Sequence, residues 1–340
     1  MKQENVTLDV LKSALQSFKG VRVHVTGDTI VDSYVYCTLI GSGASKTPTL
    51  SVRHDRQVDF IGGAAVVSKH LRHAGAEVQF STVLGDDVMK DFVLTELAAT
   101  GVECHAQVDP SRVTTQKNAY IADDYRLLKV DKIDNRPISS AIVGHLKDSI
   151  SASNAAAFVF SDFRHGIFNP NIIPQLAGAI PIGPLRIADS QVASRWGNIL
   201  DFPGFDLITP NEREARFALG DQDSVIRPLA LDLYQKAQCK MLVLKLGEQG
   251  ILTYREASSQ TGAFFSIDSF AGKVVDPVGA GDALLAYTTL ALTTTQSEVV
   301  ASILGAMAAA VACEHEGNIP VTPDQVLKKL DIVESHSHLE

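Results

Sequence analysis

The chain has 340 residues, of which 45% are hydrophobic and 20% charged, and its 30 basic against 39 acidic residues give a net charge of −9. This composition excludes a disordered or fibrous chain, and the acidic balance argues against broad binding to nucleic acid or to an anionic membrane surface. The cysteines, Cys37, Cys104, Cys239 and Cys313, show no Cys-x-x-Cys spacing. We therefore expect neither a zinc site nor a disulfide framework, and a reducing cytoplasm suits such thiols.

Apolar runs alternate with amphipathic stretches along most of the chain. In chain order, the pattern predicts strands or helices over residues 21–27, 64–75, 78–85, 87–101, 155–162, 185–190, 205–211 and 241–247. This alternation is typical of a parallel sheet covered by helices, in which ligands bind beyond the carboxyl ends of the strands. The longest apolar run, residues 299–312, is too short to span a bilayer and predicts a buried helix.

Two segments, residues 34–60 and 103–134, carry short alternating runs without helical periodicity. The second predicts a β-hairpin that turns at Ala122-Asp123-Asp124. We expect both segments to form a small β lid over the main sheet. Residues 41–47, GSGASKT, lack the glycine and the following helix of a Walker A loop, and predict a flexible lid turn. With no repeat or linker to divide it, the chain is expected to form a single domain over residues 1–340.

The segment DPVGAGDALLA at residues 276–286 places Asp282 in a glycine-rich turn before a helix. Such turns attract anions, because free N–H groups and the positive end of the helix dipole converge there. A carboxylate in this place repels phosphate, and it makes sense if it removes a proton from an attacking hydroxyl. A tight turn with a capping aspartate is the structural alternative. A dinucleotide fingerprint is disfavoured, because Leu284 occupies its third glycine position.

Four motifs in order carry a resemblance to a known family. They are GGAAVVSKHLRHAGAEVQFSTVLGDD (62–87), TPNEREA with Asn211 and Glu214, KLGEQG (245–250) and the 276–286 segment. The chain resembles the ribokinase-like, phosphofructokinase-B type carbohydrate kinases. Its closest likeness within them, through residues 25–36, 126–131 and 160–166, is to the heptose 7-phosphate kinases. This resemblance implies a three-layer α/β/α core with a mainly parallel central sheet and a small β lid.

The resemblance also implies roles at the phosphate end of a site. Asp282 would be the base, and the backbone N–H groups of Gly279, Ala280, Gly281 and Asp282 would form an anion hole. Asn211 and Glu214 would organise Mg²⁺ with the ATP phosphates through water, although a helix N-cap explains the same pair. The remaining nucleotide-side positions implied by the motifs are Lys245, Gly247 and Gly250, with Asp276 supporting the loop or holding a monovalent cation such as K⁺.

On the sugar side, Asp32 matches the family aspartate that accepts hydrogen bonds from substrate hydroxyls, and Gly62 and Gly63 would let the chain approach the sugar. Val66 departs from the family pattern, in which asparagine follows GGAA. Either the substrate is less polar at that point or sugar phosphorylation is weakened, because an unpaired buried hydroxyl would cost roughly 1–3 kcal/mol.

Basic side chains of the lid segments are candidates for binding a phosphate already present on the substrate. They are Lys117, Lys129, Arg53 and Arg56. A solvated lid surface is the alternative interpretation of these charges. His70 and His73 have helical spacing but no carboxylate in register, and we expect them on the surface rather than at a metal.

Together these features predict an ATP- and Mg²⁺-dependent kinase for a sugar or sugar phosphate, located in the cytoplasm, with a homodimer formed through the lid. Two alternatives stay open. One is a catalytically weakened family member that binds a nucleotide or metabolite as a regulator, and the other is a nucleoside kinase of the same fold.

Overall fold

The computed structural model describes residues 6–40, 49–192, 197–257, 262–315 and 317–337. Within them, a large sheet has the strand order β13-β12-β11-β10-β9-β8-β1-β4-β5, and a small sheet has the order β3-β2-β6-β7. The strands of the large sheet are β1 (Arg22–Gly27), β4 (Glu77–Leu84), β5 (Glu103–Val108), β8 (Ala157–Asp162), β9 (Leu185–Ser190), β10 (Leu207–Ile208), β11 (Met241–Lys245), β12 (Ile251–Arg255) and β13 (Phe264–Ile267). Those of the small sheet are β2 (Thr29–Leu39), β3 (Val52–Gly63), β6 (Gln116–Ala122) and β7 (Tyr125–Lys132).

Helices cover both faces of the large sheet. They are α1 (Leu8–Gln16), α2 (Ala64–His73), α3 (Val88–Thr100), α4 (Ser140–Ala152), α5 (Ile173–Ala177), α6 (Glu212–Leu219), α7 (Ile226–Ala237), α8 (Ala280–Thr295), α9 (Glu298–Cys313) and α10 (Pro323–Ser337). None of these described helices combines the length and the apolar character needed to cross a bilayer.

The apolar core has two parts because side chains along a strand alternate between the two faces of the sheet. In β8, Ala157 and Val159 belong to one cluster with α1, α2, α3, α8, α9 and α10, whereas Phe158 and Phe160 belong to the other with α4, α5, α6 and α7. The strands from β11 to β5 pair in parallel, and β12 and β13 extend one edge in antiparallel pairing. The expected three-layer α/β/α fold with a mainly parallel sheet is therefore confirmed.

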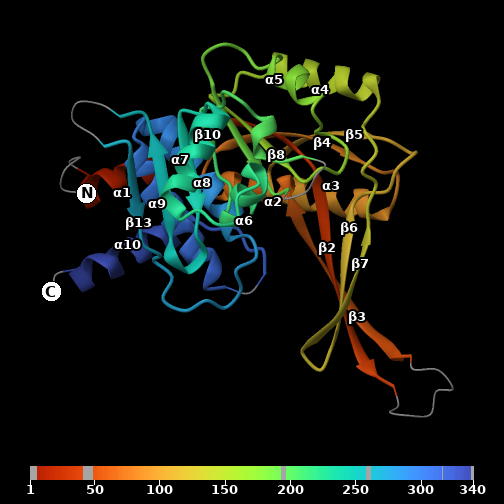
Figure 1. Ribbon diagram of the computed structural model, residues 1–340. Helices are drawn as coiled ribbons and strands as arrows, with labels where there is room; N and C mark the ends of the chain where they lie inside the picture. The colour runs from red at the N-terminus through yellow and green to blue at the C-terminus, as the bar shows by residue number, and fades with distance from the viewer. Residues whose placement is uncertain (1–5, 41–48, 193–196, 258–261, 316, 338–340) are drawn as a thin grey trace.

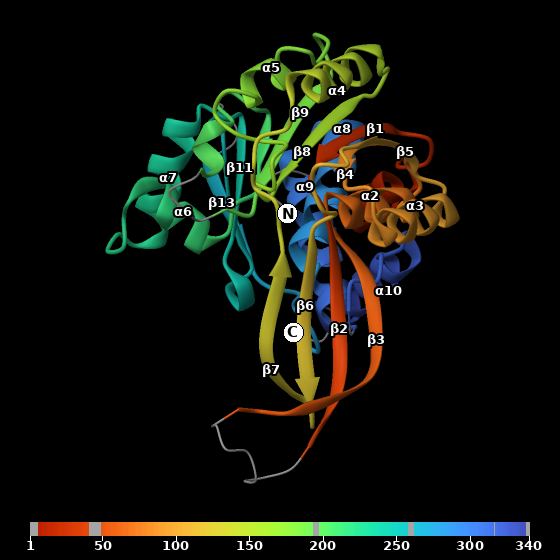
Figure 2. The same cartoon turned by 90° about the vertical axis from the view of Figure 1, so that its right-hand side faces the viewer.

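The small sheet forms the lid and extends as an arm away from the helical body (Figure 1). Figure 2 shows its four strands side by side, with β2 between β3 and β6. Strands β6 and β7 are joined at Asp123 and Asp124, which have φ angles of 49° and 63°. Two consecutive residues with positive φ are what a tight two-residue hairpin turn requires, so the predicted turn is confirmed.

The predicted boundaries of the lid are wrong in one part. Residues 103–108 form β5, which pairs in parallel with β4 at the edge of the large sheet. This edge strand is only partly buried, so its alternating sequence resembles that of a lid strand. The other lid segment also extends beyond its predicted range, from Thr29 to Gly63. The predicted turn at residues 41–47 lies outside the described residues.

His70 is buried, contrary to the prediction of a surface residue, whereas His73 is exposed as expected. His70 Nδ1 accepts a hydrogen bond of 3.1 Å from the backbone N–H of Val321, in the segment before α10. Burial lowers the pKa of His70 to about 3, which keeps the ring neutral. The contact joins parts of the chain far apart in sequence, and helical spacing alone gives no sign of it.

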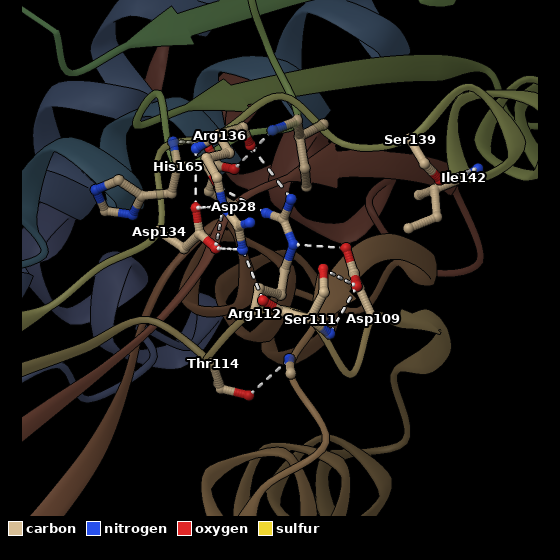
Figure 3. A network of polar contacts seen from close by, with 12 residues as sticks. Asp28, Asp109, Ser111, Arg112, Thr114, Asp134, Arg136, Ser139, Ile142 and His165 are labelled. Carbon is tan, nitrogen blue, oxygen red and sulfur yellow. Dashed lines mark hydrogen bonds and ion pairs between the residues drawn. The ribbon is translucent and has the colours of Figure 1, made fainter.

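A polar network fastens the lid to the core (Figure 3). Arg112, between β5 and β6, donates from Nε to Asp109 Oδ2 at 3.0 Å, from Nη1 to His165 O at 3.3 Å and from Nη2 to Arg136 O at 3.2 Å. Its side chain is 5% exposed. Asp28, between β1 and β2, accepts N–H bonds from the loop after β8, including those of Phe163 at 3.0 Å and His165 at 3.3 Å. These contacts fix where the lid strands leave the large sheet.

Candidate active site

A cavity of about 1160 Å³ lies between the lid and the carboxyl ends of the parallel strands. Lid strands contribute Asp32, Lys117 and Lys129 to its lining, and the ends of the sheet strands and the start of α8 supply the facing side. Among the motif residues expected at the site, Asn211, Glu214, Lys245, Gly247, Gly250, Gly279, Ala280, Gly281 and Asp282 all line this one cavity.

Asp282 is the third residue of α8 and is 7% exposed. Its Oδ1 accepts a hydrogen bond of 3.1 Å from Gln191 Nε2. Burial raises the pKa of Asp282 to about 7, and the nearby carboxylate of Asp189 adds to this effect, whereas Lys245 opposes it. A carboxylate with this pKa can take up a proton near neutral pH, which is the property that a general base needs.

Asp189 lies at the end of β9 and is fully buried, with several donors around it. Lys245 Nζ lies 3.0 Å from Asp189 Oδ1, and Thr209 Oγ1 donates to the same oxygen at 2.7 Å. Gln191 Nε2 lies 3.4 Å from Asp189 Oδ2. A buried carboxylate is stable only with such partners, so this group holds the Lys245 ammonium at the inner wall of the cavity.

Asn211 and Glu214 form a capping box at the start of α6. The Asn211 side chain accepts a bond of 2.9 Å from the Glu214 N–H, while Glu214 accepts bonds of 2.7 and 2.6 Å from the backbone N–H and Nδ2 of Asn211. The helix-cap interpretation is therefore confirmed. Burial raises the pKa of Glu214, and Lys245 opposes this rise. Within the described residues, no three His, Cys, Asp or Glu side chains converge as a ready-made metal site.

The glycine-rich turn opens α8 in the geometry that an anion site needs. Gly279 is the N-cap with a φ of 81°, and a Cβ there would stand 1.9 Å from Asn318 Oδ1. Gly281 and Asp282 follow in the first turn of α8, where backbone N–H groups have no acceptor within the helix. The Ala280 N–H reaches Pro277 O at 3.3 Å, which leaves it less available than the other two.

In the lid, Asp32 on β2 pairs with Phe60 on β3, and its carboxylate reaches toward Gly62, two residues further along β3, where the glycine makes room for it. A Cβ on Gly62 would stand 2.3 Å from Asp32 Oδ2. Asp32 and Gly63 line the cavity, whereas Gly62 is not among its lining residues. Burial raises the pKa of Asp32, and the charges of Lys117 and Lys129 oppose that rise.

Positive charge gathers at the lid end of the cavity. Lys117, Arg126 and Lys129 line it, together with Asp131 and the ring of Phe163. The other two lid arginines expected there lie elsewhere. Arg56 stacks over the Tyr36 ring at 3.8 Å, and Arg53 lies 3.1 Å from Asp55, and neither lines the cavity.

Two further positions expected at the site lie outside the cavity lining. Val66 has no exposed surface and belongs to the apolar cluster between α2 and the sheet, so it does not line the cavity. Asp276 accepts N–H bonds from Val278 at 3.0 Å and Gly317 at 3.1 Å. It thereby joins the turn before α8 to the loop after α9, in keeping with the expected support of the loop.

Four residues that the sequence did not single out lie close to this cavity or line it: Asp189, Gln191, Arg126 and Asn318. Asp189 ends a predicted strand, residues 185–190, whose neighbours also end in polar residues. Polar residues at the carboxyl ends of several predicted strands could have indicated that Asp189 lies at the site, because these ends meet at one edge of a parallel sheet. Gln191 and Asn318 belong to no motif, and only the folded chain brings them to the site.

A model described as pfkB family carbohydrate kinase matches residues 22–325. The chain is 25% identical over 338 residues to the bifunctional protein HldE of Pelobacter propionicus, which covers 96% of this chain and 67% of that protein. It therefore spans about two thirds of the length of that relative.

Solved structures show the same fold. Ribokinase of Arabidopsis thaliana, complexed with ribose and ATP, matches with a TM-score of 0.72 and 18% identity, covering 92% of this chain and 99% of that one. Phosphofructokinase-2 from Escherichia coli, in complex with fructose-6-phosphate, matches with a TM-score of 0.74 and 18% identity over the same shares. The matching fold, the shared motifs and the family match over residues 22–325 together place this chain in the pfkB family of carbohydrate kinases.

Proposed function

We propose that this protein is an ATP- and Mg²⁺-dependent kinase that transfers the γ-phosphoryl group to a hydroxyl of a sugar or sugar phosphate. Heptose 7-phosphate is the first acceptor to test. The observation that carries the proposal is the place of Asp282, a buried carboxylate with a pKa of about 7 beside the open N–H groups at the start of α8. A group there can accept a proton from an alcohol while the neighbouring N–H groups hold a phosphate.

Asp282 would deprotonate the acceptor hydroxyl as that hydroxyl attacks the γ-phosphorus and the bond to the β-phosphate oxygen breaks. The N–H groups of Gly281 and Asp282, with the Lys245 ammonium, would stabilise the charge on the transferred group. Asp32 would orient the acceptor by accepting hydrogen bonds from its hydroxyls. The lid would exclude water, so that ATP is not hydrolysed instead.

Asn211 and Glu214 fit a magnesium ion that keeps most of its waters. The Glu214 carboxylate already accepts two bonds from Asn211, yet a carboxylate offers about four lone-pair sites, so it can still receive bonds from metal-bound water. When bound, Mg²⁺ would neutralise charge on the phosphates. Gly247 and Gly250 would lie beside the nucleotide, and Asp276 would support a monovalent cation, which a comparison of rates in K⁺ and Na⁺ can test.

An acceptor that already carries a phosphate is favoured by the lid. Lys117, Arg126 and Lys129 bring three cations to the end of the cavity where the two carboxylates Asp32 and Asp131 lie, so one positive charge is left in excess. A neutral sugar gives these charges no partner, whereas a phosphate accepts several charge-assisted hydrogen bonds. The relative crystallised with fructose-6-phosphate supports the same class of acceptor.

Two alternatives make different predictions. A nucleoside kinase would favour a nucleoside over a sugar phosphate at the same site, and a regulatory relative would bind ATP without any acceptor. The cation-rich lid opposes a neutral nucleoside, and the position of Asp282 opposes a regulator that has lost its base.

A homodimer through the lid is part of the proposal. Strands β3 and β7 are the outer strands of the small sheet, and Tyr125 and Leu128 on β7 are 78% and 49% exposed. Open strand edges with exposed apolar side chains are suited to pairing with a second copy. Light scattering on the intact protein should give twice the mass of 36.5 kDa. Cytoplasmic location is proposed from the use of ATP and the four free cysteines.

The test is acceptor-dependent release of ADP over a panel of sugars, sugar phosphates and nucleosides. Stimulation by heptose 7-phosphate or another sugar phosphate, with a phosphorylated product detected by ³¹P NMR, supports the proposal. Tight ATP binding without stimulation by any acceptor would favour the regulator.

A further inference from the structure

The side-chain amide of Gln191 lies between two carboxylates. Its Nε2 is 3.1 Å from Asp282 Oδ1 and 3.4 Å from Asp189 Oδ2. Gln191 follows β9 directly, lines the cavity and is itself exposed, whereas both carboxylates are buried. The amide therefore bridges the two buried carboxylates at the wall of the cavity.

The orientation of this amide follows from chemistry. A carboxylate only accepts hydrogen bonds when ionised, and of the two ends of a glutamine amide only the NH₂ group donates. The NH₂ group has two hydrogens, one for each carboxylate, so the assignment with Nε2 between them satisfies both. The reversed amide would place its oxygen against two carboxylate oxygens, with no proton to share while both are ionised.

We infer that Gln191 is a positioning residue for Asp282. The NH₂ group of Gln191 bridges Asp282 and Asp189, and it thereby fixes the rotation of the Asp282 carboxylate and favours the ionised form of that carboxylate. Oδ1 is held by the amide, and Oδ2 is left for the acceptor hydroxyl. The catalytic meaning of this inference rests on the proposed function, whereas the effect on the Asp282 carboxylate does not require turnover.

Three charged side chains also shift the pKa of Asp282, and the hydrogen bond from Gln191 acts in addition to them. Asp189 at the end of β9 and Asp32 on the lid disfavour its ionised form, and Lys245 at the end of β11 favours it. Lys245 forms an ion pair with Asp189, so its positive charge is shared between Asp189 and Asp282. Gln191 is the neutral donor that bonds Asp282 directly, and it does so without a charge that would hold a phosphate too tightly.

A charge-graded series at Gln191 tests the inference by ¹³C NMR titration of the Asp side-chain carboxyls, with the Asp282 signal assigned by its loss in Asp282→Asn. Loss of the donor in Gln191→Leu should raise the pKa of Asp282 by about one pH unit, because hydrogen bonds to the ionised form lower a carboxyl pKa. Gln191→Lys should lower it, and Gln191→Glu should raise it further than leucine does. Gln175→Leu, an exposed glutamine on α5, is the matched control and should leave the titration unchanged.

Kinetics give the second readout. With an active acceptor, kcat/KM of Gln191→Leu should fall about fivefold at pH 7 and recover at higher pH, because the base is then ionised again. A loss that is equal at every pH would indicate a merely structural role and overturn the inference. So would the same Asp282 titration midpoint in wild type, Gln191→Leu and Gln191→Lys, each checked for folding by circular dichroism. If no acceptor is found, the proposed function fails, yet the NMR series still decides the role of Gln191.

Discussion

Lys245 and Asp189 form an ion pair at 3.0 Å that joins the ends of two parallel strands directly beneath the first turn of α8. A Cβ on Gly281 would stand 3.3 Å from the Lys245 ammonium, so this cavity-lining cation lies against the glycine-rich turn that opens α8. The pair therefore places one positive charge where the phosphates of a nucleotide are expected, and it keeps that charge from moving away.

Replacing Lys245 by methionine should raise the dissociation constant for ATP by at least tenfold, since charge-assisted bonds to phosphate contribute roughly 1.5–3 kcal/mol. It should also destabilise the fold, because Asp189 would lose its cation while buried. Isothermal calorimetry with ATP and thermal unfolding check both effects. Unchanged ATP affinity in a folded Lys245→Met protein would contradict the assigned role. Lys236→Met, whose ion pair with Asp232 is exposed, is the control.

The turn before α8 should not tolerate a side chain at Gly279. Gly279→Ala combines a φ of 81° with a Cβ placed 1.9 Å from Asn318 Oδ1, so the turn or the Asn318 loop must move. We expect lower stability and weaker ATP binding. Gly144→Ala is the matched change, because Gly144 lies within α4 with no atom near its Cβ position. It should stabilise the protein by about 0.5–1 kcal/mol and leave ATP binding as in wild type.

The lid cations should determine the preference for phosphorylated acceptors. Lys117→Met combined with Lys129→Met should raise KM for a sugar phosphate about 10- to 100-fold, because charge-assisted bonds to phosphate are lost. KM for the corresponding plain sugar should change little. Lys132→Met, on the same strand as Lys129 but outside the cavity lining, should match wild type. Equal losses for phosphorylated and plain sugars would argue against a phosphate subsite.

The raised pKa of Asp282 gives a pH dependence with a definite sign. The folded pKa of about 7 exceeds the usual value of 3.8, so ionisation destabilises the fold increasingly from about pH 4 to pH 7. The rate should rise over the upper part of this range, because only the ionised carboxylate accepts a proton. Asp282→Asn should therefore be more stable than wild type at pH 8, by on the order of 2 kcal/mol, and this gain should shrink toward pH 4. Urea unfolding at both pH values measures it, and an equal difference at both would contradict the shift.

Arg112 should matter for both stability and lid position. Arg112→Ala removes a buried side chain that donates to Asp109 and to two backbone carbonyl groups. Loss of these three hydrogen bonds should destabilise the protein by about 1–3 kcal/mol and lower kcat, because the lid strands lose an attachment to the loop after β8. Arg22→Ala, at an exposed position of β1, is the control. Wild-type melting temperature in Arg112→Ala would contradict the role drawn from Figure 3.

Much of the fold could be predicted from sequence, because alternating apolar runs are a local pattern that indicates parallel strands and covering helices. The motifs also singled out residues that line one cavity, including the glycine-rich turn before Asp282. The anion site at that turn stays a prediction. The boundary of the lid at β5 could not be predicted, because pairing with β4 depends on contacts outside the segment. Val66 illustrates the same limit, since its burial in the apolar cluster is a property of packing rather than of its motif.

Residues whose role depends on contacts between segments far apart in the sequence could not be predicted. Gln191 belongs to no motif, and its role depends on its contact with Asp282. Arg126 begins the segment 126–131, but that pattern alone does not show that its side chain lines the cavity. His70 is a related case, because its partner Val321 comes from the other end of the chain. In each case the informative quantity is a contact between distant segments.

The most direct test of the whole account is acceptor-dependent ADP release by Asp282→Asn at pH 8, with ATP affinity measured on the same sample. The account predicts a rate about 10²- to 10⁴-fold below wild type with ATP binding retained, because the base is lost while the N–H groups of α8 stay in place. A folded Asp282→Asn protein that transfers phosphate at the wild-type rate would contradict it.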